Sequence, residues 1–202
     1  MASYVWLSIS VNLTLCFSAL FSSYKLFKDH RAPSVGLFLV GLSAGLCVFP
    51  STPIQKDAEW VGEILAPSLL AFHLMWLSED HSTACMLLIG SCLLLGLRDS
   101  LSADTLVVLS RCLGLASLSC SLMVCLFAGN PTGALTSVAL SLPVLLVPTF
   151  GRDSFGSLVS LTANEVVIRL LLKGSMSVGC WVSTHSLHRF LMDVTDRYHL
   201  HI

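Results

Sequence analysis

The chain has 202 residues, of which 54% are hydrophobic and only 11% are Asp, Glu, Lys or Arg. Soluble domains carry about 25% charged residues, so this composition excludes an ordinary soluble protein, and a formal net charge of -1 with high hydrophobicity excludes a disordered chain. There is no basic excess to neutralise phosphates, so we expect no nucleic-acid partner. The composition predicts a protein that uses the lipid bilayer as the solvent for most of its surface.

Six apolar segments are each close to the length of a bilayer crossing, which takes about 20 mainly apolar residues for a hydrocarbon core of about 30 Å. In chain order they are Tyr4–Tyr24, Val35–Pro50, Val61–Leu77, Thr83–Leu97, Leu106–Ala128 and Thr132–Phe150. The fourth segment is short, which fits the endoplasmic reticulum, because its bilayer is a few Å thinner than the plasma membrane. We therefore expect an integral, multi-pass protein of the endomembrane system.

The C-terminal part predicts a seventh crossing and then an amphipathic helix. Phe155–Leu172 is apolar enough to span, although Asn164, Glu165 and Arg169 lie near its middle, where each charge costs about 2.5–3.5 kcal/mol. Beyond it, apolar residues recur at helical spacing opposite a polar face, which is typical of a helix lying in the membrane surface; they are Leu187, Phe190, Leu191 and Val194. The predicted fold is an all-α polytopic transmembrane helix bundle over residues 1–184 with a cytosolic amphipathic tail over 185–202.

The distribution of Lys and Arg favours seven crossings over a rival topology with six. With seven crossings and the N-terminus outside, seven of the 11 basic residues lie on the cytosolic side, including Lys25, Lys28 and Arg31 after the first segment and Arg169 and Lys173 near the last. Six crossings with the N-terminus inside place eight there. We prefer seven because charges beside the first crossing usually dominate orientation. An eighth crossing over 174–192 leaves five inside and six outside, which is disfavoured.

Motifs of catalysis and metal binding are missing from the sequence. No CxxC pair, nucleophile-elbow serine, HExxH helix or phosphate-binding glycine loop is present, so we expect no cofactor, no metal site and no enzyme activity. The eight cysteines all lie in or beside apolar stretches, where free Cys behaves as a small hydrophobic residue. Glu63 and His73 on the third segment are ten residues apart, so they do not form an acid–base pair.

Two sets of residues are candidates for a functional role inside the membrane. Glu165 and Arg169, with Asn164 beside them, are four apart and share a helix face, so they form a candidate intramembrane ion pair. Gly41 and Gly45 form a GxxxG motif in the second segment, and small residues at this spacing let helices approach closely. The alternative interpretations are an interfacial position for the charged pair and internal packing for the glycines.

The sequence therefore predicts a non-enzymatic membrane protein that acts by helix packing with other membrane proteins, in assembly, trafficking or scaffolding. A small-solute or ion transporter is the alternative, using Glu165 and Arg169 with helix breaks at Pro67 and Pro143. A further alternative is an intramembrane lipid-modifying enzyme that uses histidines and aspartates of the tail, which are His185, His188, Asp193, Asp196, His199 and His201.

Overall fold

The computed structural model describes residues 2–28, 31–48, 53–150 and 162–199, with side chains except at 2–5, 53–56, 147–150, 162–166 and 186–199. These ranges contain seven α-helices, one short 3-10 turn and no strand, so the all-helical prediction is confirmed. The helices are α1 Ala2–Leu26, α2 Arg31–Leu46, α3 Pro53–Leu77, α4 His81–Gly96, α5 Ala103–Phe127, α6 Pro131–Phe150 and α7 Thr162–His199, and the 3-10 turn is η1 Arg98–Ser100.

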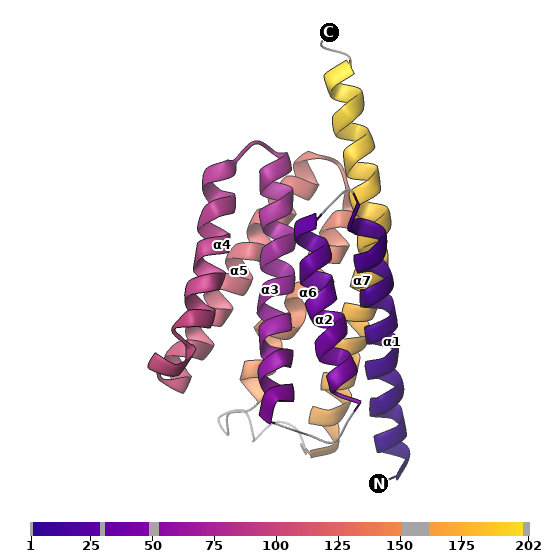
Figure 1. Cartoon of the computed structure of the whole chain (residues 1–202), viewed down its shortest axis with the longest axis vertical. Helices are drawn as coiled ribbons and strands as arrows, with labels where there is room; N and C mark the ends of the chain where they lie inside the picture. Colours follow the sequence, from indigo (N-terminus) through magenta and orange to yellow (C-terminus); the bar gives the residue numbers. More distant parts are fainter. Residues whose placement is uncertain (1, 29–30, 49–52, 151–161, 200–202) are drawn as a thin grey trace.

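Successive helices run in opposite directions, so the two chain ends lie at opposite ends of the bundle (Figure 1). Contacts link α1 to α2, α2 to α3, α3 to α6, α6 to α7 and α7 back to α1, which closes a ring of five helices. The pair α4 and α5 packs on the outside of this ring, against α3 and, for α5, also against α6. Every described element of the bundle is helical, and a helix forms its backbone hydrogen bonds within itself, as a crossing of hydrocarbon requires.

Local signals explain where the helices begin and end at the connections. Asp80 caps α4, because its carboxylate accepts hydrogen bonds from the backbone N–H of Thr83 at 3.1 Å and from the Thr83 hydroxyl at 2.7 Å. Gly129 follows α5 with φ 67°, a left-handed conformation that glycine adopts without steric cost. Pro131 then opens α6, where its missing N–H is not needed.

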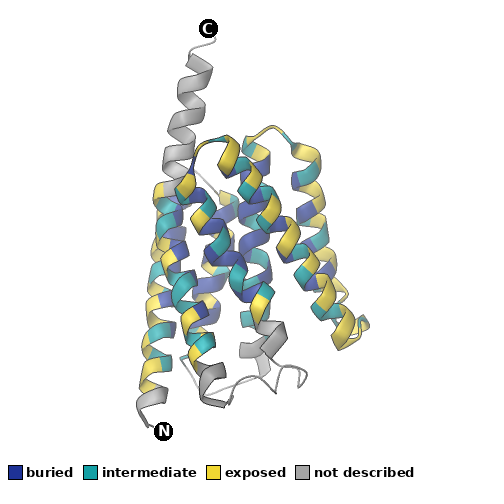
Figure 2. Ribbon diagram, turned by 180° about the vertical axis from the view of Figure 1, so that it is seen from behind, coloured by how far each residue is buried: buried dark blue, intermediate teal, exposed yellow. Residues whose placement is uncertain are grey.

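Buried residues lie on the faces that the helices turn toward one another (Figure 2), and on α5 these buried residues are small while the exposed ones are large and apolar. On α5 the buried positions are Ser110, Gly114, Ser117, Ser121 and Cys125, while large side chains of the same helix such as Met123, Leu126 and Phe127 are exposed. A soluble protein has the reverse arrangement, with its large aliphatic residues in the core. The distribution fits a surface in contact with lipid, with small residues allowing close helix packing.

Three helices of the described ranges are long and apolar enough to cross a membrane by themselves, namely Trp6–Leu26, Asp57–Leu77 and Ala103–Phe127. The other apolar segments are shorter, at Arg31–Leu46, His81–Gly96 and Pro131–Leu146. All six coincide with predicted segments.

The last helix differs from the prediction. A single helix of 38 residues, α7, runs through the predicted boundary at 184 and 185. Among its residues 167–185, whose side chains are described, the buried ones are Leu172, Met176, Gly179, Cys180 and Ser183. The packed part of α7 thus lies C-terminal to most of the predicted segment Phe155–Leu172, of which residues 155–161 are outside the described ranges. The physical reason is tertiary, because small residues of α7 fit closely against α6: a Cβ added at Gly179 would lie 2.9 Å from the Cβ of Ala139.

Candidate functional site: a charged pocket between four helices

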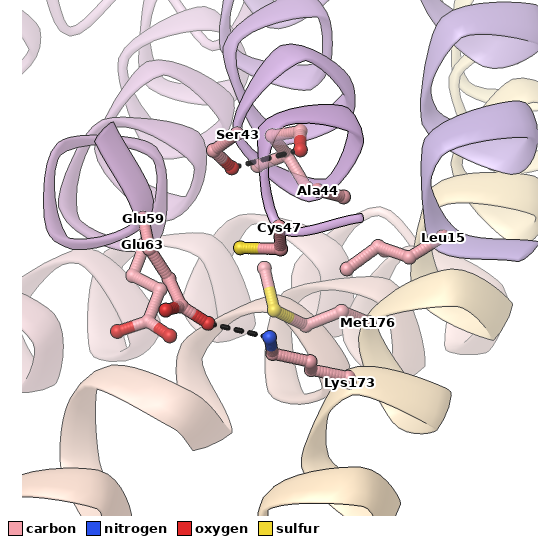
Figure 3. Close-up of a pocket in the computed structure, with 9 residues that line it drawn as sticks. Leu15, Ser43, Ala44, Cys47, Glu59, Glu63, Lys173 and Met176 are labelled. Atoms are coloured by element: carbon pink, nitrogen blue, oxygen red, sulfur yellow. Dashed lines mark hydrogen bonds and ion pairs between the residues drawn. The ribbon is translucent and has the colours of Figure 1, made fainter. Parts of the chain in front are cut away.

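One small pocket brings charged residues together inside the bundle, and we call it the charged pocket (Figure 3). It lies between α1, α2, α3 and α7, and its lining residues are Leu15, Val40, Ser43, Ala44, Cys47, Glu59, Glu63, Lys173 and Met176. The space open to the centre of a water molecule is about 10 Å³, which is close to what one water or one small ion needs.

Lys173 ties three helices together at this pocket. Its Nζ lies 2.6 Å from Glu59 Oε1 on α3 and donates a hydrogen bond of 3.0 Å to Asn12 Oδ1 on α1. The side chains of Lys173 and Glu59 are 21% and 29% exposed, so the ion pair is mostly, but not completely, buried. Asn12 is buried, at 3% exposure, and its amide oxygen is satisfied by this bond.

A second carboxylate lies beside this ion pair. Glu63 is one helical turn after Glu59 on α3, and both side chains line the pocket, where the Glu59 carboxylate is joined to Lys173 (Figure 3). Glu63 is half-buried and experiences the charges of Glu59, Lys173 and Arg169. When all three pocket groups are ionised, two negative charges face one ammonium. The lining residues of the pocket therefore carry an excess of one negative charge in a medium where charge is costly, while Arg169 supplies a positive charge to Glu63 from outside the lining.

The charged groups lie near one end of the apolar spans. Glu59 is the third residue of the span Asp57–Leu77, and Asn12 is the seventh residue of Trp6–Leu26, so at 1.5 Å per residue they lie about 3 Å and about 9 Å from those ends. Deeper in the bundle the pocket is closed by apolar walls. Ser43 adds no free donor, because its hydroxyl donates to the carbonyl of Val40 at 2.9 Å.

A second ion pair lies at the same end of α3. Arg98 of η1 donates a hydrogen bond to Asp57, and its guanidinium lies over the ring of Trp60 at 5.1 Å from the centroid. The bond to Asp57 raises the pKa of Arg98 above its ordinary value. This pair joins the α4–α5 connection to α3, so the end of α3 that carries Glu59 and Glu63 is held from both sides.

The structure places the predicted candidates differently. Arg169 is exposed on α7, one turn before Lys173, and it acts on Glu63 by its charge. Asn164 and Glu165 belong to α7, but their side chains lie outside the described part of the chain. The count of basic residues placed Lys173 on the same side as Lys25; in the structure Lys173 instead lies toward the end where α3 begins, opposite the end where α1 finishes. The predicted orientation, with the N-terminus outside, counted Lys173 together with Lys25, so the distribution of Lys and Arg now supports that orientation less.

The two glycines of the GxxxG motif face a helix of the same chain. A Cβ added at Gly41 would lie 2.9 Å from Leu20 Cγ of α1, and one added at Gly45 would lie 3.3 Å from Cys16 Sγ. Both positions thus belong to the contact between α1 and α2. The surface that they would offer to another protein is occupied inside the molecule.

The sequence reading missed Glu59, Lys173 and Asn12 as a group. Two signals pointed to them: Glu59 and Glu63 are four apart at the start of one apolar segment, and Lys173 directly follows another. Their pairing depends on which helices are neighbours, which the sequence does not state.

The predicted metal ligands of the tail lie almost entirely outside the described side chains, since only His185 is described, and it is exposed. Within the side chains that the structure describes, no group of three or more His, Cys, Asp or Glu is placed to hold a metal ion.

Comparison with known proteins gives relatives of the same size. This chain is similar to transmembrane protein 276. It is 24% identical to the mouse protein and 26% identical to the bovine protein over 186 residues, covering 91% of this chain and 92% of each relative. The human protein is 24% identical over the same length. No family model and no solved structure matches the chain. The relatives are named as transmembrane proteins, which, together with the apolar outer surface, supports a membrane location for this chain.

Proposed function

We propose that the chain is a multi-pass membrane protein that crosses the bilayer seven times and acts without catalysing a covalent reaction. The alternating direction of the seven helices and the opposite positions of the two chain ends support this topology (Figure 1). The endoplasmic reticulum is the proposed location, because α2 and α4 have only 16 residues each and span about 24 Å. Such helices match a thin bilayer best.

Glycosylation mapping tests this topology. Acceptor sites placed between α2 and α3 and at the C-terminus lie on opposite sides of the membrane under seven crossings, so only one of them becomes glycosylated. Glycosylation of both sites, or of neither, would contradict seven crossings.

The function that the charged pocket supports best is the binding of one small cation, a proton or an alkali ion, as a step in its transport. Glu63 carries this proposal, because it places a second carboxylate beside an ion pair that is already complete. A cation bound there would cancel the excess negative charge in a medium of low dielectric. Pro67 lies one turn after Glu63 and cannot donate the helical hydrogen bond to its carbonyl, so α3 is weakened beside the pocket.

Flux into liposomes tests the transport proposal. Purified protein is reconstituted, and uptake of protons, Na⁺ and K⁺ is followed with ion-sensitive dyes. Glu63→Gln removes the extra charge and leaves the pair of Glu59 and Lys173 in place, so we expect flux to fall to the level of protein-free liposomes. Glu79→Gln, which lies exposed in the α3–α4 connection at the other end of the bundle, is the matched control and keeps its flux. Equal flux for wild type and Glu63→Gln, or none for wild type, would refute the proposal.

A groove between α1 and α7 favours a second candidate function, contact with a partner membrane protein in assembly, trafficking or scaffolding. The groove encloses about 640 Å³ and is lined by Leu13, Thr14, Phe17, Ser18, Phe21, Ser177, Val178 and Trp181. Ser18 and Ser177 are hydrogen-bonded to each other at 3.0 Å at its base, and Phe17 is 73% exposed at its rim. Hydroxyls and small residues between aromatic walls are the features of contacts between membrane helices.

Purification from native membranes in a mild detergent tests the partner proposal. Phe17→Ala together with Trp181→Ala should reduce the co-purified protein that mass spectrometry identifies with the wild type. Met123→Ala, on the exposed face of α5, is the matched control. A wild-type protein that elutes as a single species without a companion would refute this function.

A further inference from the structure

A second outward groove lies at the connection between α1 and α2, and we call it the α1–α2 groove. It encloses about 430 Å³. Its lining residues are Leu20, Ser23, Tyr24, Phe27, Ser34, Val35 and Phe38. The groove lies at the end of the bundle where α1 finishes and α2 begins, and so at the edge of the apolar region (Figure 1).

The interior of this groove is suited to hydrocarbon. The two serines of its lining, Ser23 and Ser34, bind each other: the Ser23 hydroxyl donates to the Ser34 carbonyl at 2.9 Å, and the Ser34 hydroxyl donates to the Ser23 carbonyl at 2.8 Å. Both serines are buried. Because these hydroxyls are already satisfied, a ligand gains no polar contact at the base, and aromatic side chains such as Tyr24, which is 82% exposed, form the walls.

The mouth of the groove is positively charged. Lys25, Lys28 and Arg31 are all exposed, and Lys25 Nζ lies 5.0 Å from the centroid of the Phe21 ring. Residues 25–31 carry these three cations against a single acid, Asp29. The α3–α4 connection at the same end carries Glu79 and Asp80 instead. Among the side chains described at this end of the bundle, the Lys and Arg residues therefore gather at the rim of the α1–α2 groove.

We propose that the α1–α2 groove binds an anionic phospholipid, with an acyl chain between the aromatic walls and the phosphate headgroup on the basic rim. The apolar cleft matches the acyl chain of such a lipid, and the cations at the mouth of the cleft match the negative charge and the position of its headgroup. A neutral lipid would use the cleft without using the cations. Each basic residue near a membrane surface contributes a modest attraction to anionic headgroups, equivalent to about fivefold in affinity.

Lipid retention in nanodiscs tests this proposal. The protein is reconstituted with equal amounts of phosphatidylcholine and phosphatidylserine, released, and its bound lipids are counted by native mass spectrometry. Wild type should retain phosphatidylserine in preference to phosphatidylcholine, and Lys28→Gln with Arg31→Gln should lower that preference about 25-fold. This double variant leaves the contact of Lys25 with Phe21 intact, so it is not expected to disturb folding.

Two further variants separate the parts of the site. Lys56→Gln removes a cation in the first turn of α3, at the opposite end of the bundle, and should leave the preference unchanged. Val35→Trp fills the cleft and should reduce retention of phosphatidylserine while the basic rim stays intact. Equal retention of both lipids by wild type, or an unchanged preference in the Lys28 and Arg31 double variant, would overturn the proposal.

Discussion

The contact between α6 and α7 gives the sharpest test of the fold, through two glycines of one helix. A Cβ added at Gly179 would lie 2.9 Å from the Cβ of Ala139, whereas a Cβ added at Gly174 meets nothing within 4 Å. Carbon atoms in good contact are about 3.5–4.0 Å apart, so α6 and α7 must separate by about 0.6–1.1 Å in Gly179→Ala. The Ala139 Cβ cannot rotate away, because it is attached directly to the backbone.

The magnitude follows from two opposing effects. Overpacking costs about 1–3 kcal/mol, and replacing a helical Gly by Ala returns about 1 kcal/mol of helix propensity. We therefore expect Gly179→Ala to lower the free energy of unfolding by about 0–2 kcal/mol. Gly174→Ala gains the propensity without the overpacking, so it should be more stable than Gly179→Ala by about 1–3 kcal/mol. For a chain of this length, 1 kcal/mol corresponds to a change in Tm of about 2–4 °C.

The assay is the fraction of monodisperse protein left after heating in detergent, measured by size-exclusion chromatography for both variants and wild type. Gly179→Ala should lose half of its native peak several degrees below Gly174→Ala. Equal behaviour of the two variants would refute the packing of α7 against α6. It would also remove the reason for shifting the packed part of α7 beyond the predicted segment Phe155–Leu172.

Three further predictions concern the charged pocket, a helix cap and the outer surface. Lys173→Met should lower the free energy of unfolding by about 1–2 kcal/mol more than Glu59→Gln does, after allowance for the partial exposure of the pair. The reason is that Lys173→Met leaves two carboxylates and Asn12 without their cation, and equal thermal stability of the two variants would contradict this. Hydrogen bonds from Thr83 hold the pKa of Asp80 below its ordinary value, so its capping of α4 stabilises the fold above the unfolded-state pKa and is lost as pH falls through the folded-state pKa; Asp80→Asn keeps a cap and should abolish this acid dependence of Tm. In membranes, a lipid-soluble diazirine, which forms a carbene on illumination and needs no thiolate, should label the chain at exposed Cys85, Cys92 and Cys112 and spare fully buried Cys125 and Cys180, as mass spectrometry of the peptides would reveal; labelling at the buried pair would contradict the core assignment.

The sequence was sufficient to locate the first six helices. Predicted segments such as Tyr4–Tyr24 and Leu106–Ala128 lie within about two or three residues of α1 and α5 at most ends, because runs of apolar residues must form complete helices in lipid. Helix starts were less accurate where the first turns are polar: α3 begins at Pro53, well before the predicted start at Val61. Polar residues in the first turns of a helix face water and do not raise the local hydropathy, so a search for apolar runs does not include them in the helix.

The candidate site could not be predicted, because it depends on which helices meet. The GxxxG motif indicates a close helix contact but does not name the partner, and the partner of Gly41 proved to be α1 of the same chain. Glu59 and Lys173 are far apart in sequence and become a pair only when α7 returns to the beginning of α3. The sequence of one chain shows which residues are polar, but it does not show which helices are neighbours.

The position of Lys173 also explains why α7 packs where it does. A crossing centred on the predicted segment would leave Glu165 and Arg169 in the middle of the hydrocarbon, at about 2.5–3.5 kcal/mol each. In the structure, the packed residues of α7 that are described, such as Met176 and Cys180, follow this segment. Lys173, which precedes them, pairs with Glu59 of α3. The cation that directly follows the predicted segment is thus neutralised by a carboxylate of α3.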